Sequence, residues 1–247
     1  MRGLWKLSQT EFKLFLREPA AAFFILAFPV LILLLFGSIY GNDPSDLFNG
    51  YGSVDISVPS YTAMIIATSG LLSLPIMLTT YREQGVLRRL RATPIRPQLI
   101  LTAQVGVIFL MTLIGMILMV IVGKLVYDLR FSGSLLNVLV IFILGSFSFF
   151  TLGFVLAGIV TTARMAQIVA MVLFYPMIFL SGAAIPREIL PENILNISKI
   201  LPLTYLVTAL RGVWFGADLN EYLTEIGIML AMLIVGLVVS VYTFRWE

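Results

Sequence analysis

The chain has 247 residues, of which 60% are hydrophobic and only 12% are charged, and its mean hydropathy is +1.02. Soluble domains carry about 25% charged residues, so this composition indicates a membrane protein. The chain contains no histidine and no cysteine, which excludes disulfides, thiol chemistry, histidine bases and metal sites built on either residue.

Residues 1–18 are predicted to form an amphipathic helix lying at the inner membrane surface. On a helical wheel the apolar side chains fall within about 120° of one another and the basic ones lie opposite. The apolar set is Leu4, Trp5, Phe12, Phe15 and Leu16, and the basic set is Arg2, Lys6, Lys13 and Arg17. Such a helix suits the boundary between acyl chains and anionic headgroups. An ordinary juxtamembrane tail would explain the charges but not their segregation.

Six uncharged stretches of 19 to 33 residues follow, and each is long enough to cross a hydrocarbon core of about 30 Å as a helix. They predict an all-α integral membrane protein with transmembrane helices over residues 20–40, 60–81, 98–123, 134–161, 165–185 and 222–244. Prolines at positions 29, 75 and 176 are expected to bend three of these spans. The uncharged stretch at 200–210 has only 11 residues, so it is expected to lie at an interface or to re-enter the membrane.

The charges are distributed unequally between alternate connecting segments. With the N-terminus placed in the cytoplasm, the inner segments carry eleven basic and four acidic residues, and the outer segments carry five basic and nine acidic residues. Because basic residues favour the cytoplasmic side, both termini are expected to be cytoplasmic, and the long first apolar run is expected to be a true span rather than a cleavable signal peptide.

The segment 82–97, between the second and third spans, is predicted to be cytoplasmic and to contain a short amphipathic helix. Val86, Leu87 and Leu90 share one narrow face of that helix, and arginines occupy the rest. Thr93 and Pro94 end it, because the residue before a proline is disfavoured in the α region. A basic loop that only sets topology is the alternative, but it leaves the lone acid Glu83 unexplained.

The segment 186–221 is expected to be extracellular, and it is too apolar for an ordinary exposed loop. Pro191 and Pro202 each open a short helical stretch that is expected to lie in or dip into the outer leaflet. Arg211 sits among apolar residues, so it is expected to pair with a carboxylate or with carbonyls at a helix C-terminus. Asp218 and Glu221 have the spacing of a helix N-cap with its capping-box acid.

Two stretches resemble a known family. YREQGVLRRLRATPIRPQ, residues 81–98, is similar to the segment between the second and third spans of the ABC-2 type permeases, the membrane subunits of bacterial drug and antibiotic exporters. FLSGAAIPREILPENILNISKILPLTYLVTALRG, residues 179–212, resembles the segment after their fifth span. The resemblance implies that the first stretch contains a coupling helix that docks into an ATP-binding subunit, and that the second caps the outer side of the translocation path. Transferred to this chain, the coupling residues are Arg82, Glu83, Gly85, Val86, Leu87, Arg88, Leu90, Thr93 and Pro94.

The source of free energy is expected to lie in a partner. Apart from Glu225 near an outer end, the spans contain almost no ionisable residue of the kind that proton- and sodium-coupled transporters use. The chain also lacks the G-x-x-x-x-G-K-[ST] phosphate-binding loop. We therefore expect this chain to bind no cofactor or metal and to have no catalytic residues, with ATP and Mg²⁺ held by a separate ATPase subunit.

These observations predict a permease subunit that exports an amphipathic or lipophilic substrate such as a drug, an antibiotic or a lipid-like molecule. Its expected partners are two ATPase subunits, a second copy of itself or a homologous permease, and membrane lipids of the bacterial inner membrane, but no nucleic acid. Candidate residues of the substrate path are Met64, Ser69, Ser73, Phe174, Tyr175 and Met177. Alternatives are a permease for polysaccharide, haem or lipid, a scaffold or channel that needs no ATP, and an intramembrane enzyme, for which the spans lack a carboxylate cluster.

Overall fold

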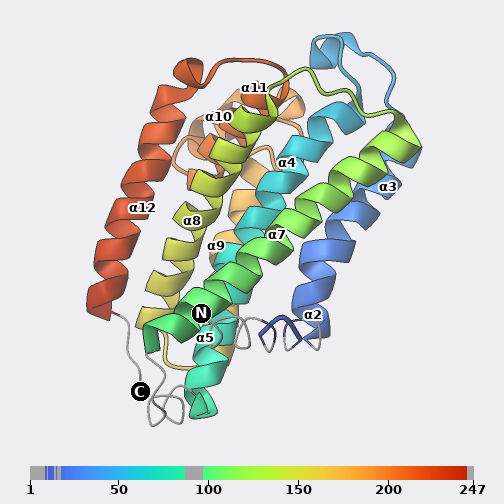
Figure 1. Ribbon diagram of the computed structural model, residues 1–247. Coiled ribbons are helices and arrows are strands. Elements are labelled where there is room, and N and C mark those ends of the chain that lie inside the picture. The colour runs from blue at the N-terminus through green and yellow to red at the C-terminus, as the bar shows by residue number, and fades with distance from the viewer. Residues whose placement is uncertain (1–8, 10, 14, 16–17, 87–96, 244–247) are drawn as a thin grey trace.

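The computed structural model describes residues 9, 11–13, 15, 18–86 and 97–243 (Figure 1). These residues form helices and connecting segments, with no strand among them. Within this part of the chain, six helices are long and apolar enough to cross a membrane, which confirms the predicted all-α membrane fold. They cover Phe23–Tyr40, Asp46–Glu83, Leu101–Tyr127, Leu135–Ile159, Ala163–Leu180 and Leu219–Thr243.

The first two spans are each built from several helical segments. The first consists of α2 (Pro19–Ala22), η1 (Phe23–Ala27) and α3 (Phe28–Tyr40), and the second of α4 (Ser53–Ala67), η3 (Thr68–Ser73) and α5 (Leu74–Glu83), preceded by the short η2 (Asp46–Phe48). The later elements are α7 (Pro97–Tyr127), α8 (Leu135–Ile159), α9 (Ala163–Leu180), η4 (Arg187–Ile189), α10 (Glu192–Ser198), α11 (Pro202–Trp214), η5 (Leu219–Tyr222) and α12 (Leu223–Thr243).

The helices form a bundle with two distinct ends (Figure 1). We call the end that holds α2, the end of α5 and the end of α12 the lower end, and the end that holds α10 and α11 the upper end. The second span is the centre of the bundle, because 78% of its most apolar window is buried, whereas only 11% of the last span is. The other spans are therefore arranged around α4 and α5.

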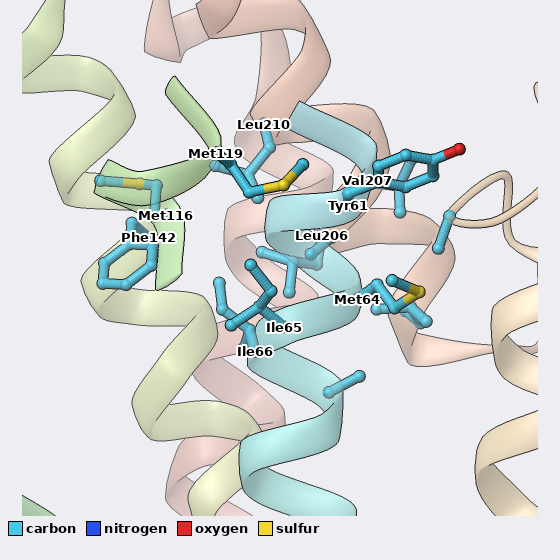
Figure 2. Close-up of a cluster of buried hydrophobic side chains, with 14 of the residues drawn as sticks. Tyr61, Met64, Ile65, Ile66, Met116, Met119, Phe142, Leu206, Val207 and Leu210 are labelled. Carbon is cyan, nitrogen blue, oxygen red and sulfur yellow. The ribbon is translucent and has the colours of Figure 1, made fainter. Parts of the chain in front are cut away.

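The main core lies where α4, α7, α8 and α11 meet. Figure 2 shows Tyr61, Met64, Ile65 and Ile66 of α4 beside methionines of α7, Phe142 of α8 and three aliphatic residues of α11. Ile65, Ile66 and Phe142 are completely buried. Burial of each such side chain stabilises a water-soluble fold through the hydrophobic effect, but in a membrane the gain comes from close packing and contact with small residues.

Prolines at positions 29 and 75 each follow a π-helical turn. The N–H of Phe28 bonds to the carbonyl of Phe23, and that of Leu74 bonds to Ser69, both five residues back. Since proline has no N–H to donate, nearby carbonyls lose their helical donors. Glycines of neighbouring helices approach them. A Cβ on Gly115 of α7 would lie 2.8 Å from the carbonyl oxygen of Ile25, and one on Gly153 of α8 would collide with the carbonyl of Gly70.

Helix α4 of the second span begins at Ser53, seven residues before the predicted boundary at 60, and Asp55 in its first turn is buried rather than exposed. Its Oδ2 accepts a hydrogen bond from the Gly52 N–H at 3.0 Å, which caps α4. Its Oδ1 accepts from the Arg130 N–H at 2.8 Å and from the Asn42 side-chain amide at 3.0 Å. These bonds satisfy the carboxylate and tie the segment before α4 to the α7–α8 connection at the upper end.

The fifth span ends at Leu180, before the predicted boundary at 185. Gly182 has a φ of +92°, a left-handed conformation that favours glycine and does not continue a helix. The chain then passes through η4 into α10 and α11, which are bent by 102° relative to each other. Counted as one broken span, this pair would bring the number of membrane-spanning helices to seven, by length and composition alone.

The polar contacts expected in this upper segment are present. Both Nη atoms of Arg211 lie at the carboxylate of Glu188, so Arg211 has the carboxylate partner that its apolar surroundings require. Asp218 and Glu221 form the predicted capping box, which starts η5 immediately before α12. Pro191 and Pro202 stand at the starts of α10 and α11, as predicted.

Candidate functional site

Arg82, near the C-terminal end of α5, joins the predicted coupling segment to the rest of the bundle. Its Nη1 donates a hydrogen bond to the carbonyl of Ala157 at 3.1 Å, and its Nη2 donates to the carbonyl of Val160. Since α8 ends at Ile159, these carbonyls belong to the helix end that lacks intrahelical donors and carries partial negative charge. Arg82 therefore caps α8 from a neighbouring helix.

The connection that Arg82 contacts is short. Val160 is the C-cap of α8, and Thr162 is the N-cap of α9, where its hydroxyl accepts a hydrogen bond from the Met165 N–H at 3.1 Å. Helix α5 also packs against both α8 and α9. A displacement of the end of α5 would therefore act directly on the point where the chain passes from the fourth span to the fifth.

A second contact at the lower end joins α5 to the N-terminal segment. Among the described residues of that segment, Phe15 is buried in the main core and Lys13 is exposed. Glu11 is only 7% exposed, and its Oε2 accepts a hydrogen bond from the Tyr81 hydroxyl at 3.0 Å. Burial raises the pKa of Glu11 above its usual value, and the hydrogen bond from Tyr81 acts in the opposite direction.

Helix α5 stops where the coupling segment was predicted to begin. Gly85 has a φ of +65°, and its N–H bonds to the carbonyl of Arg82 at 3.0 Å, so it closes the helix in a conformation that favours glycine. Glu83 is exposed and Val86 is half-buried. The remaining coupling candidates, Leu87, Arg88, Leu90, Thr93 and Pro94, lie outside the described residues.

The six path candidates differ in their exposure. Met64, Phe174 and Met177 are buried in the main core, whereas Tyr175 is 50% exposed and Ser73 is half-buried. Ser69 is fully buried, and its hydroxyl lies 2.7 Å from that of Thr112 on α7, which makes it an interhelical contact. The assignment of these residues to a substrate path stays a prediction.

Sequence reasoning overlooked Glu11 and assigned Arg82 only to the partner. On the helical wheel Glu11 falls about 20° from Leu4, at the edge of the apolar face, and an acid there signals a buried contact. The inward bonds of Arg82 had no comparable signal, because they depend on where α8 ends. Among the described residues, no group of three or more acidic side chains is placed to hold a metal ion.

The six spans, the buried central helix and the bent upper pair of helices define a polytopic membrane protein. Residues 2–215 match the ABC-2 type transporter family, and the chain belongs to that family. The resemblance noted in the sequence is thereby confirmed.

Two relatives are similar to this chain over much of its length. It is 26% identical to ycf38 of Porphyra purpurea, named a transport permease, over 92% of this chain and 79% of the relative. It is also 26% identical to YbhR of Escherichia coli K12, named a multidrug ABC transporter permease, over 64% of this chain but only 43% of YbhR. Both are named for transport rather than for catalysis.

Proposed function

We propose that this chain is the membrane-spanning subunit of an ATP-driven exporter, and that ATP and Mg²⁺ are bound by a separate subunit. The observation that carries the proposal is the bond of Arg82 to the end of α8, at the point where the sequence resembles a coupling segment. ABC-2 permeases work with ATPase subunits, and family membership supports such a partner here.

In the proposed mechanism, ATP-driven closure of two ATPase subunits moves the segment that follows Glu83. Arg82 transmits this motion to the α8–α9 connection, and the Tyr81–Glu11 bond transmits it to the N-terminal segment. The spans would then tilt and open the path outward. Glu83 is exposed and therefore accessible to the partner. Arg82 has contacts within the chain and connects the moving segment to the α8–α9 connection.

Two permease subunits, identical or homologous, would enclose the path. Helix α9 presents an apolar exposed face at helical spacing that suits either lipid or a second subunit, formed by Met165, Ile168, Val172, Tyr175 and Phe179. We place the protein in the bacterial inner membrane with the lower end in the cytoplasm, because Arg82 at the end of α5 and Arg164 at the start of α9 belong to connections at that end and basic residues favour the cytoplasmic side.

The proposed substrate is amphipathic or lipophilic. The name of YbhR supports a drug, and the apolar spans argue against a highly charged polymer. Polysaccharide, haem or lipid is the alternative cargo within the same family, and a scaffold or channel without ATP coupling is the alternative function.

The test is purification from the native host in mild detergent, followed by reconstitution with any ATPase that co-purifies. Reversing the charge of the exposed Glu83, as Glu83→Lys, should lower both transport and transport-stimulated ATP turnover. The matched control is Glu192→Lys, which reverses an exposed acid at the upper end. Unchanged transport and ATP turnover in Glu83→Lys would contradict the coupling role, and the absence of any co-purifying ATPase would favour the scaffold or channel.

A further inference from the structure

A cavity of about 580 Å³ lies at the upper end of the bundle. Its wall combines two arginines with aromatic and aliphatic side chains. The residues that matter for its chemistry are Arg187, Arg211, Glu188, Tyr51, Phe215 and Tyr222. The rings of Tyr51 and Phe215 are in contact, with centroids 4.0 Å apart. The cavity therefore offers both cationic donors and apolar surface.

Glycines hold two of these side chains in place. The stem of Arg187 occupies the space that a side chain on Gly182 would need, and the ring of Tyr222 occupies the corresponding space at Gly212. Both glycines belong to the stretch 179–212, so this stretch both builds the bent pair of helices and shapes the cavity. Arg187 and Tyr222 are positioned by close packing rather than by chance contact.

The charges in the cavity are not balanced. Arg211 is paired with Glu188, whereas Arg187 donates one hydrogen bond, from Nη1 to the Thr208 hydroxyl at 2.6 Å. Among the described residues no carboxylate forms an ion pair with Arg187. Glu188 and, more weakly, Glu225 act on it electrostatically without forming an ion pair. The three charged lining residues thus leave one positive charge in the wall.

The surroundings of Arg187 make that charge costly. Burial lowers the pKa of the Arg187 guanidinium, and the neighbouring charge of Arg211 lowers it further, although a guanidinium stays protonated in proteins. An anion bound between the two arginines would relieve both effects. A guanidinium has five N–H donors in a planar fork that matches the oxygens of a phosphate or carboxylate. Arg187 uses one of these donors in its hydrogen bond to Thr208.

We propose that this cavity binds the phosphate group of an amphiphile, with Arg187 as the principal donor and Arg211 as the second. A phosphodiester carries one negative charge, which equals the excess in the cavity wall, and the volume exceeds what a bare carboxylate requires. The cavity lies at the upper end of the bundle, and the proposal places it at the level of the lipid headgroups, where aromatic and basic side chains of membrane proteins gather. The aromatic side chains then contact the glycerol and the start of the acyl chains. This inference does not depend on ATP coupling.

The experiment measures lipid binding to the purified full chain in mild detergent by native mass spectrometry. The probes are dioleoylphosphatidylglycerol and dioleoylglycerol, which share their acyl chains and differ by the phosphate headgroup. Soluble glycerol phosphate is the third probe. The variants are Arg187→Gln, Arg187→Lys and the double replacement of Arg211 and Glu188 by glutamine. Arg164→Gln, which removes an exposed arginine at the lower end, is the matched control.

The intact chain should retain phosphatidylglycerol in preference to dioleoylglycerol. Arg187→Gln should weaken that binding about tenfold or more, as loss of a charge-assisted hydrogen bond does. Arg187→Lys should weaken the binding less, because lysine keeps the positive charge but lacks the planar set of guanidinium donors. If Arg187→Gln does not fold, the comparison of Arg187→Lys with the intact chain tests the proposal. The double variant should also weaken the binding, and Arg164→Gln should not.

The probes distinguish a membrane lipid from a soluble phosphate ester as the source of the bound phosphate. Arg187-dependent binding of phosphatidylglycerol alone identifies a membrane lipid, and Arg187-dependent binding of glycerol phosphate identifies a soluble phosphate ester. Equal retention of both lipids, or unchanged binding in folded Arg187 variants, would overturn the proposal. Because the assay contains no ATPase, neither result bears on the coupling role of Glu83.

Discussion

Replacing Arg82 with glutamine should loosen the end of α8 without disturbing the rest of the bundle. The guanidinium donates to the carbonyls of Ala157 and Val160 from a half-buried position. Hydrogen bonds from charged donors contribute about 1.5–3 kcal/mol each, and a cation at a helix C-terminus adds roughly 0.3–1 kcal/mol. Because glutamine can keep one weaker bond, we expect a net local loss of about 2–3 kcal/mol.

Hydrogen exchange measured by mass spectrometry in lipid nanodiscs would detect this change. The Val160 N–H, which bonds to the Leu156 carbonyl at 3.1 Å, lies directly at the capped end. A local loss of 2 kcal/mol corresponds to an exchange rate about 30-fold faster for amides that open locally. Arg82→Lys should give a smaller increase, because one ammonium can still donate to a carbonyl.

The control for this experiment is Arg164→Gln, which removes an exposed arginine from the first turn of α9, only a few residues beyond the same connection. Its exchange at residues 156–163 should match that of the unmodified chain. If Arg82→Gln also leaves exchange in this window unchanged, the cap contributes nothing, and Arg82 cannot be the attachment point through which α5 acts on α8.

Two further predictions concern the titration of the buried Glu11 and the close approach of Gly153 to the carbonyl of Gly70. Because burial raises the pKa of Glu11 above its usual 4.5, its contribution to the free energy of unfolding should be complete below pH 4.5 and be lost as pH rises through the raised pKa. Thermal unfolding of Glu11→Gln should lack that decline, whereas the exposed Glu192→Gln should keep it. Gly153→Ala should destabilise the bundle by about 1–3 kcal/mol, because its Cβ would collide with the Gly70 carbonyl. Gly106→Ala, which meets nothing within 4 Å, should instead be neutral or stabilising in the same melts, and equal destabilisation of both variants would refute the argument.

Features that depend on local chemistry were predictable from the sequence. The six spans follow from the spacing of the charges, and the starts of α10 and α11 follow from prolines that fit a first helical turn. The partner of Arg211 could be predicted as a kind of group, since a cation among apolar residues requires one. Its identity as Glu188 required the bend that brings the start of η4 beside α11.

Features that depend on contacts between distant segments could not be predicted. A charge was taken to mark the end of a span, but Asp55 lies within α4, because backbone and side-chain donors from the Asn42 and Arg130 regions satisfy its carboxylate. The same limit applies to Arg82. Its charge and its place in a basic segment indicated an external partner, whereas the carbonyls it caps are 75 and 78 residues away in sequence.

The π-helical turn η3 has a consequence for how the second span is oriented. Such a turn inserts one residue into an α-helix, which rotates everything beyond it by about 100°. Helix α4 packs against α3, α7, α8 and α11, whereas α5 packs against α8 and α9. Deleting one residue between Thr68 and Ser73 would leave a span of sufficient length and the same hydropathy, yet it would turn Arg82 away from the end of α8. Hydropathy does not record helical register, yet register decides which face of α5 meets α8 and α9.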